Sequence, residues 1–536
     1  MVTIPEHLLP VLRRDLLAFG PEVVLILGMV TMLVVRMFRG SERLPFGAVA
    51  AGIIGLSLVV SWWQWVTDQT LSPSGGGLSQ TRYLFAHMLA YDAFTVYLRL
   101  FLTAFGLFLV ALCVLSKVPD AEDAADFYVL LTGATLGMML MASAGHLLMV
   151  YLAVEMASLP SYALAGFLKL RRDSSEAALK YVVYGGGASG LMLYGISMLA
   201  GKCGTGFLPD VAVSVAATLG REQFDAVTII SLLLILAGIG FKLAAVPFHF
   251  WCPDVFAGAS AEVAGFLSVA SKGAAVALLG RVLVAFLGGM RLTEHELPSL
   301  YWAKVSWYLG PALVFLSAVT MTFGNLAAYA QTNLKRLLAY STIAHAGYMM
   351  MGLCALTREG VEAALFYLAV YFFMNLGAFA VVAFVRNAVG SEELSGYSGL
   401  VYRAPWLTVT MAVFLLSLVG LPPLAGYMAK FQIFAAVYHA WQSQQQTGLL
   451  VLLALGLLNT VLSLFYYVNV LKVMILHEPR ETPAGRSVSP LALVYTGLCA
   501  LVLLVGIFFW DPLASGTQKA VSSFHEIQPP ARVSPP

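Results

Sequence analysis

The chain has 536 residues, of which 60% are hydrophobic and only 11% are charged. Soluble domains carry roughly 25% charged residues, so this composition excludes a soluble globular protein and indicates a polytopic helical membrane protein. The net charge is +2 without clustered Lys and Arg, which excludes a nucleic-acid partner. Neither the five cysteines nor the nine histidines have the spacing of a metal or haem site, so we expect no bound cofactor.

Apolar stretches of about 20 residues, the length of a spanning helix, follow one another along the chain. They predict an all-α fold with about fourteen transmembrane helices. The predicted ranges are 19–38, 46–66, 91–116, 127–144, 146–168, 177–200, 227–248, 261–288, 307–328, 334–354, 361–386, 404–441, 449–473 and 489–511. The first is expected to be a retained helix, because no small-residue cleavage site follows it. From residue 512 we expect a short disordered tail.

The distribution of basic residues predicts the orientation. An even number of spans places both termini on one side, and four basic loops then lie on the other side. The positive-inside rule makes the side of these loops cytoplasmic, with the termini outside. The loops contain Arg36, Arg39 and Arg43, then Lys169, Arg171 and Arg172, then Lys335 and Arg336, then Lys472, Arg480 and Arg486.

Two spans, the seventh and the twelfth, are interrupted by prolines. The segment 238–258 contains Pro247, and the segment 417–437 contains Pro422 and Pro423. Proline removes an amide donor and clashes with the preceding turn, which breaks or kinks a helix. Broken helices at corresponding places in two halves are typical of the working site of a transporter, although two ordinary proline kinks would read the same way.

Four ionisable residues lie inside predicted spans, namely Glu155, Lys242, Lys272 and Lys430. Each costs about 2.5 to 3.5 kcal/mol at a helix centre, so they must face a polar interior. Static ion pairs are the alternative to a functional role, but three lysines against one clear carboxylate leave unpaired charge. We therefore interpret the four residues as a functional set.

Lysine suits proton transfer, since burial favours its neutral form and a nearby carboxylate favours the ammonium. Glu155 and Lys242 form the natural modulating pair, Lys272 is placed to pass the proton along waters, and Lys430 is the next station.

Other polar residues give weaker indications. His249 and His345 ionise near neutral pH and either bridge waters or belong to a hydrogen-bonded core. Lys180 begins the sixth span, where its ammonium can snorkel to the interface. Residues closer to span ends are expected to snorkel or to cap helices, with Asp92 as an N-cap. The snorkelling or capping set is Glu22, Arg99 and Arg281.

The two broken spans indicate an internal repeat. Spans four to eight shifted by five spans give spans nine to thirteen, and an odd shift inverts the repeat in the membrane. The resulting organisation has N-terminal helices in 1–126, a first half-channel repeat in 127–288 and a second, inverted repeat in 289–473. The last helix and the disordered tail occupy 474–536.

Five sequence runs occur in the order found in a known family. They are FKLAAVPFHFWCPDVFAGA, FLSVASKGA, QTNLKRLLAYSTIAHAGYMMMG, YFFMNLGAFA and GLPPLAGYMAKF. Over about residues 20–475 the chain therefore resembles the antiporter-like membrane subunits of respiratory complex I (NADH-quinone oxidoreductase). The opening PEVVLILGMV, the run EAALKYVVYGG and the lysine in the twelfth span point to one particular subunit of that family.

The resemblance implies a multi-pass subunit of a proton translocase in a bacterial inner (plasma) membrane, with periplasmic termini. Proton movement would be driven by quinone reduction elsewhere in the complex. The implied partners are other membrane subunits, including further antiporter-like ones, together with the lipid bilayer. NAD, flavin, iron–sulfur clusters and quinone are then expected in partner subunits, with no cofactor, metal or redox chemistry in this chain.

The resemblance also assigns roles to residues. The separation of Glu155 and Lys242 would set proton affinity, Lys272 would be the central relay and Lys430 would lead to the outside. Lys180 and His249 fall in matching motifs, which supports a secondary relay role for them beside that of His345.

One departure stands out. After PDVFAGA the family usually has Pro-x-Pro-Val, whereas this chain has Ser-Ala-Glu-Val at 260–263. We expect Glu262 to cap the following helix and assign it no proton role.

Two other functions remain open at this stage. A subunit of a multisubunit sodium/proton antiporter shares this fold and similar lysines, and a structural scaffold would use its buried charges only to bind partner helices.

Overall fold

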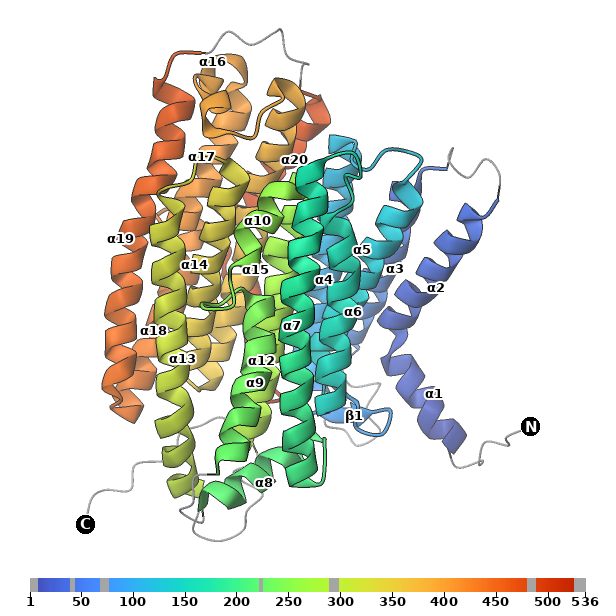
Figure 1. Cartoon of the computed structure of the whole chain (residues 1–536), viewed down its shortest axis with the longest axis vertical. Coiled ribbons are helices and arrows are strands. Elements are labelled where there is room, and N and C mark those ends of the chain that lie inside the picture. Colours follow the sequence, from blue (N-terminus) through green and yellow to red (C-terminus); the bar gives the residue numbers. More distant parts are fainter. Residues whose placement is uncertain are drawn as a thin grey trace.

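The computed structural model describes residues 8–38, 44–67, 77–220, 225–288, 298–479 and 488–524. Most helices run roughly along the long axis of the molecule (Figure 1). The first part of the chain contains α1 (Leu8–Ala18), α2 (Gly20–Arg36), α3 (Phe46–Val66), α4 (Ala93–Ser116), α5 (Ala124–Ser143), α6 (Leu147–Ala165), α7 (Arg172–Cys203) and α8 (Leu208–Gly220). A short antiparallel pair, β1 (Arg82–Leu84) and β2 (Leu89–Tyr91), precedes α4, and the single turn η2 (Gly77–Ser79) precedes β1.

The middle of the chain contains α9 (Ala226–Leu243), α10 (Trp251–Gly258), α11 (Ala261–Phe266) and α12 (Lys272–Gly288). A π-helical stretch, Leu267–Ser271, joins the last two into one span. The remaining helices are α13 (Pro298–Ala328), α14 (Leu334–Cys354), α15 (Arg358–Val389), η4 (Leu394–Tyr397), α16 (Leu400–Arg403), α17 (Pro405–Val419), α18 (Ala425–Gln444), α19 (Thr447–Leu476), α20 (Pro490–Val505) and α21 (Asp511–Ala520).

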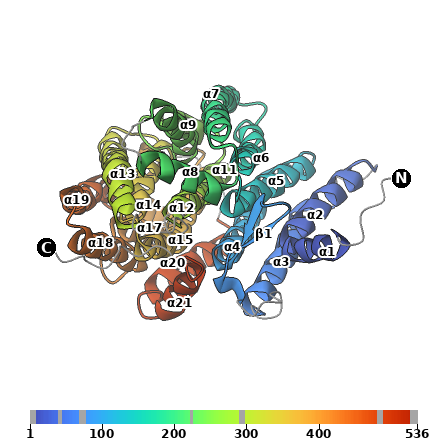
Figure 2. The same cartoon turned by 90° about the horizontal axis from the view of Figure 1, so that it is seen from below.

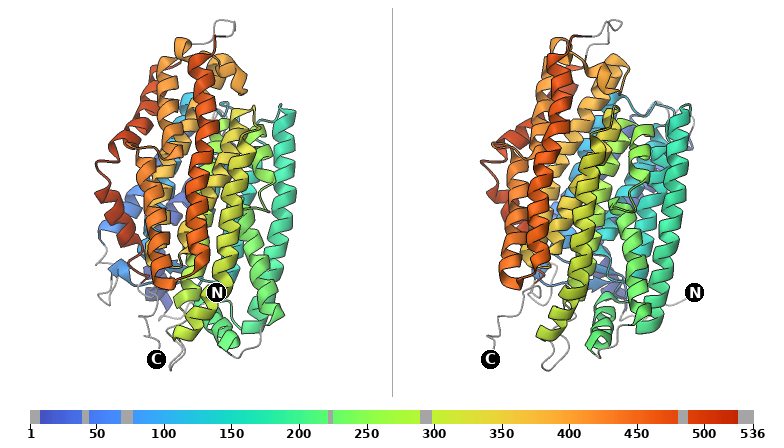
Figure 3. Two further views of the ribbon diagram at one scale, coloured as in Figure 1. Left: turned by 90° about the vertical axis from the view of Figure 1, so that its left-hand side faces the viewer. Right: turned by 60° about the vertical axis from the view of Figure 1, so that its left-hand side comes forward.

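The cross-section separates early from late helices. Seen from below, α1 to α5 lie at one side and α13, α18 and α19 at the other, with α12 and α15 between them (Figure 2). Further views show the long late helices side by side (Figure 3). The all-α, polytopic prediction is confirmed.

Ten described helices are long and apolar enough to cross a membrane, or up to eleven if α1 and α2, which meet at 79°, count as one span. The count of fourteen, the inverted relation of the two halves and the domain boundaries stay predictions. Both predicted breaks are present: α9 ends at Leu243 before α10, and α17 ends at Val419 before α18.

Both terminal helices lie at the same end of the bundle. The Gln64 side chain, at the C-terminal end of α3, donates to the Ala18 carbonyl oxygen (3.1 Å) at the end of α1. The Lys519 ammonium of α21 donates to the neighbouring Trp65 carbonyl (2.9 Å). Placement of both terminal helices on one side is therefore as expected for an even number of spans.

The tail prediction is wrong for 512–520, which belong to α21. Proline at an early helical position supports the start of this helix, since no amide donor is needed there. Phe524, just beyond α21, packs its ring 5.1 Å from Phe94 of α4, and this contact holds the segment against the bundle. Residues 525–536 lie outside the described residues, as do Arg39, Arg43, Arg480 and Arg486 of the basic loops.

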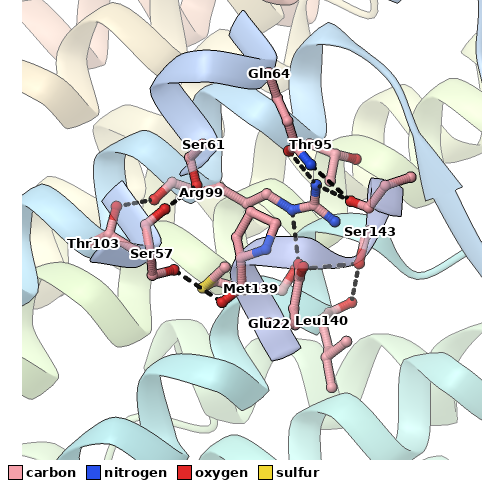
Figure 4. A network of polar contacts seen from close by, with 12 residues as sticks. Glu22, Ser57, Ser61, Gln64, Thr95, Arg99, Thr103, Met139, Leu140 and Ser143 are labelled. Atoms are coloured by element: carbon pink, nitrogen blue, oxygen red, sulfur yellow. Dashed lines mark hydrogen bonds and ion pairs between the residues drawn. The ribbon is translucent and has the colours of Figure 1, made fainter. Parts of the chain in front are cut away.

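The charged residues expected to snorkel are instead buried and paired with one another. Arg99 donates to Glu22 (2.7 Å) and to Gln64 (3.0 Å), as the close-up of this network shows (Figure 4). Arg281 forms two hydrogen bonds to Asp92 (2.5 and 2.9 Å). Asp92 also accepts from the Thr95 amide (2.9 Å), so its prediction as an N-cap is confirmed. The snorkelling prediction is wrong because each charge is neutralised by a partner from a distant helix.

Lys335 differs from its prediction as a loop residue. It lies in the first turn of α14, where its side chain is fully buried, pairs with Glu392 (2.8 Å) and donates to the Ala259 carbonyl (2.7 Å).

The Glu22–Arg99 pair predicts a large stability effect. Arg99→Met leaves a buried carboxylate without its partner, which costs about 3 to 5 kcal/mol for pairs of this kind. We expect a clearly lower thermal midpoint for the variant purified in detergent. The matched control is Arg36→Met, because the pair of Arg36 with Asp126 is partly exposed and such pairs contribute about 0 to 1 kcal/mol. Equal midpoints for the two variants would contradict a stabilising role.

Candidate functional site

Lys242 lies at the end of the first half of the broken seventh span. It is the second-last residue of α9 and is fully buried. Its ammonium donates to the Ser158 hydroxyl of α6 (2.9 Å). The helix ends here because Ala244 adopts a left-handed conformation (φ 56°). The Ala244 and Ala245 amides still donate to the Phe241 and Gly240 carbonyls, whereas the Lys242 carbonyl has no amide donor among the described residues.

Two side chains from outside α9 donate hydrogen bonds to its last carbonyls. The Trp251 indole of α10 donates to the Phe241 carbonyl (3.0 Å), and the Lys272 ammonium of α12 donates to the Lys242 carbonyl (3.1 Å). The Lys272 ammonium also lies 4.4 Å from the centre of the Trp251 ring. Because a helix C-terminus is electronegative and an aromatic face attracts cations, this position favours an ammonium group.

A local irregularity positions Lys272. The residue directly follows the π-helical stretch Leu267–Ser271, and such stretches are frequent at functional sites because they re-aim side chains. Trp251 is in turn held by Tyr181 of α7, whose ring stacks on it at 4.3 Å. Thus α7, α10 and the π-helical stretch together place one ammonium group at the end of α9.

Glu155 lies on α6, one turn before Ser158, and is partly buried. It is near enough to Lys242 for an electrostatic interaction, but the two form no ion pair within 4.0 Å. Its Oε1 atom is buried and has no hydrogen-bond partner. The structure therefore places Glu155 and Lys242 near one another but does not join them in an ion pair. That Glu155 sets the proton affinity of Lys242 stays a prediction.

The broken twelfth span repeats the arrangement at α9. Lys430 of α18 is buried, and its ammonium donates to the Val419 carbonyl (2.9 Å), the last of α17. Gly420 follows with φ 88°, and a Cβ atom there would approach the Lys430 side chain to 2.9 Å. The ammonium also lies 4.5 Å from the centre of the Tyr348 ring. In this respect Lys430 resembles Lys272, whose ammonium donates to the Lys242 carbonyl at the end of α9.

His345 lies in a fully buried cluster of hydroxyl groups. Its Nδ1 is 2.5 Å from the Tyr367 hydroxyl and its Nε2 is 3.2 Å from the Tyr467 hydroxyl. The Tyr467 hydroxyl also contacts the Ser341 hydroxyl. His345 and Tyr348 share α14, with rings 6.0 Å apart, so this cluster borders the Lys430 ammonium.

A second polar group adjoins His345 on the side of α15. The Tyr371 ring lies 5.1 Å from the His345 ring, and its hydroxyl donates to Thr342 (3.2 Å) and accepts from Asn375 (2.8 Å). Sequence reasoning missed these hydroxyl groups and the positioning residues Ser158 and Trp251. The tyrosines and Asn375 were detectable as polar residues four apart on one apolar helix.

The two secondary candidates occupy different surroundings. His249 lies in the break between α9 and α10, nearly buried, with its ring 4.4 Å from that of Phe323 and its Nδ1 without a partner. Lys180 is 37% exposed and pairs with Asp254 (2.7 Å) and Glu176 (2.8 Å). Only His249 is therefore inside the bundle next to the broken span.

Lys180 belongs to a polar cavity of about 580 Å³ at the end of the bundle opposite the terminal helices. The short helix α10 links this cavity to the interior of the bundle, because it carries both the cavity residue Asp254 and the buried Trp251. The charged lining residues are Arg171, Asp173, Glu176, Lys180, Asp254, Arg336, Arg386, Glu392 and Glu393. Within the described part of the chain, no group of three or more His, Cys, Asp or Glu could hold a metal ion.

Comparison with known proteins defines the class. Residues 144–463 match the family described as "NADH:quinone oxidoreductase/Mrp antiporter, TM", and the chain belongs to this family of polytopic membrane proteins. The NADH-quinone oxidoreductase subunit N of Anaeromyxobacter sp. (strain Fw109-5) is 37% identical over 540 residues, which cover 97% of this chain and 99% of the relative. Subunit N 2 of Sorangium cellulosum (strain So ce56) is 38% identical over 94% of this chain and 97% of the relative.

Solved structures agree with this assignment. A chain of respiratory complex I from Thermus thermophilus with bound aureothin matches with a TM-score of 0.70 and 28% identity, over 92% of this chain and 98% of that chain. A chain of the Mrp complex from Dietzia sp. DQ12-45-1b has a TM-score of 0.79 but only 18% identity, over 95% and 98% of the two chains, and shows the fold alone. Within the family, the chain is a homologue of subunit N of NADH-quinone oxidoreductase, as its motifs predicted.

The Ser158 contact makes a structural prediction. Ser158→Ala removes the acceptor of the Lys242 ammonium, and Glu155, one turn away on the same helix, has a buried carboxylate oxygen without a partner. We expect a cryo-EM structure of the variant to show Lys242 and Glu155 within 4 Å. Ser161→Ala is the control, because the Ser161 hydroxyl donates only to its own helix, at Ala157 (2.6 Å). An unmoved Lys242 ammonium in Ser158→Ala would contradict this expectation.

Proposed function

We propose that the chain translocates protons across the membrane as a subunit of an NADH-quinone oxidoreductase complex. One observation carries this proposal. Lys242, Lys272 and Lys430 are buried, and in the described part of the chain none of them forms an ion pair with a carboxylate. Buried lysines held only by carbonyl and hydroxyl oxygens can lose a proton without leaving a carboxylate unpaired.

The contrast with the other buried charges supports this role. Arg99, Arg281 and Lys335 each have a carboxylate partner within 3 Å, as expected for charges that hold helices together. The cost of three unpaired ammonium groups is too large to be retained for structure alone. A proton carrier needs this property, because burial must favour its neutral form for part of the cycle.

The proposed relay begins at Glu155 and Lys242 and continues to Lys272, which touches the Lys242 carbonyl. From there it passes the hydroxyl cluster around His345 to Lys430 and leads to the outside. Waters would complete the hydrogen-bonded chain between these groups. His249 and Lys180 act in secondary positions, beside the break and in the cavity.

The relatives also support a proposal for the partners and the location. The complex would supply the driving force through NADH oxidation and quinone reduction in other subunits, which would hold the NAD, flavin, iron–sulfur and quinone sites. This chain would lie in a bacterial inner membrane beside further antiporter-like subunits, with its termini in the periplasm and the basic loops in the cytoplasm.

The relay predicts the effect of removing single lysines. Lys242→Met or Lys430→Met in the assembled complex should lower proton pumping and coupled quinone reduction at least ~10-fold, because proton transfer by a positioned group contributes more than this factor. Pumping is measured in proteoliposomes with a pH-sensitive dye. The control is Lys202→Met, since Lys202 is partly exposed and pairs with Asp225 away from the relay. Intact pumping in the first two variants would support the scaffold function.

The ion is tested separately. If protons are the only transported ion, pumping should not change when sodium replaces potassium, and no sodium uptake should be detected with ²²Na. Sodium uptake that depends on Lys242 would instead support the antiporter alternative.

A further inference from the structure

Glu262 stands where the family motif leads us to expect proline, and its surroundings differ from those of a helix cap. Ser260 caps α11, since its hydroxyl accepts from the Val263 amide (3.3 Å). The expectation that Glu262 caps this helix is therefore wrong. The Glu262 side chain is fully buried and points to α15, where Arg386 donates to its Oε1 atom (3.1 Å).

Only one of the two oxygens of the Glu262 carboxylate accepts a hydrogen bond. The Oε2 atom of Glu262 is buried and has no hydrogen-bond partner. A buried carboxylate oxygen without a donor is costly, so most such groups are fully satisfied. The unfilled oxygen can accept a proton while Oε1 keeps its bond from Arg386.

Arg386 connects Glu262 to the polar cavity. Its side chain is 15% exposed and lines the 580 Å³ cavity together with Glu392. Arg386 therefore separates the buried carboxylate from the space that is open to solvent. The backbone just before α11 is also held in place, because Lys335 pairs with Glu392 and donates to the Ala259 carbonyl.

We propose that Glu262 is a proton-loading carboxylate between the cytoplasmic cavity and the relay. This proposal rests on the proposed function. A hydronium ion in the cavity gives its proton to Oε2 of Glu262, so that an O–H bond forms there, one breaks in the hydronium and water remains. Arg386 stays a cation, and the Glu262 charge changes from negative to neutral.

The proton then leaves Oε2 for the neutral amine of Lys272 through intervening waters. Lys272 lies about ten residues further along the same span, or ~15 Å at the rise of a helix. The Ser271 hydroxyl, next to Lys272, is buried without a partner and can take part in this transfer. When the proton leaves, the carboxylate is restored for the next cycle.

Two titratable groups interact with Glu262 itself, Arg386 of α15 and Cys113 of α4. The other helices that pack on α11 carry Lys335 (α14), Cys252 and Asp254 (α10), and Tyr151, Glu155 and Tyr162 (α6), while the π-helical stretch contributes no titratable residue. Of these carboxylates, Asp254 is held by Lys180 and Arg336, and Glu155 faces Lys242. Asp254 is 29% exposed, whereas Glu262 is fully buried and paired with Arg386 of the cavity wall.

A purely structural role is the competing explanation, because the Glu262–Arg386 pair replaces two prolines at the start of the span. The two roles differ in their pH dependence. A loading site matters most when protons are scarce, whereas a structural defect lowers the rate equally at all pH values.

The experiment compares variants of the complete complex in proteoliposomes from pH 6 to pH 9. For Glu262→Gln we expect pumping near the wild-type rate at pH 6 and about tenfold slower at pH 9, because general acid–base transfer requires the titrating group. Glu262→Asp should keep most of the activity at both values. Glu359→Gln, an exposed carboxylate at the other end of α15, should match the wild type throughout.

A double variant keeps the test decisive if Glu262→Gln assembles poorly. Ser260→Pro with Glu262→Pro restores the prolines of the family and lacks the carboxylate, so it should show the same loss at high pH. A wild-type pH profile in this variant, or a pH-independent loss in Glu262→Gln, would overturn the proposal. Lys272→Met in parallel tests the relay itself: intact pumping there would reject the proposed function, whatever the result at Glu262.

Discussion

The structure depends on hydrogen bonds between buried ammonium groups and main-chain carbonyls at helix ends. A helix that stops inside the hydrocarbon region leaves carbonyl groups without donors, and lipid offers none. Here the donors are lysine side chains, Lys272 at the end of α9 and Lys430 at the end of α17. Two costs that would each be prohibitive alone, a broken span and a buried cation, are thereby offset by one another.

The buried charges fall into two groups with different partners. Ion pairs such as Glu22–Arg99 and Asp92–Arg281 join helices that are far apart in sequence and carry no net charge. The lysines of the broken spans contact neutral oxygens and aromatic rings. The ion-paired residues are stabilised in their charged forms by their partners. The lysines of the broken spans can change their charge state without breaking a salt bridge.

Much of this arrangement was predictable from the sequence. The prolines of the two interrupted spans located both breaks, and the rarity of charge in the spans identified Lys242, Lys272 and Lys430. The pairing of charges was not predictable, because Arg99 and Glu22, or Lys335 and Glu392, meet only through tertiary packing. The role of main-chain carbonyls was also hidden, since every residue has one and only the fold decides which is free.

The Lys272 hydrogen bond has a consequence for genetic dissection. Its acceptor belongs to the backbone of residue 242, so replacing the Lys242 side chain leaves that acceptor in place. Substitutions at the two positions can therefore be combined in a double-mutant cycle. The Lys242 change keeps the main-chain contact, and the Lys272 change removes it in both backgrounds, so the contribution of that contact cancels in the cycle. Any coupling energy that the cycle measures would then report on the interaction between the two side chains and not on the hydrogen bond that positions Lys272.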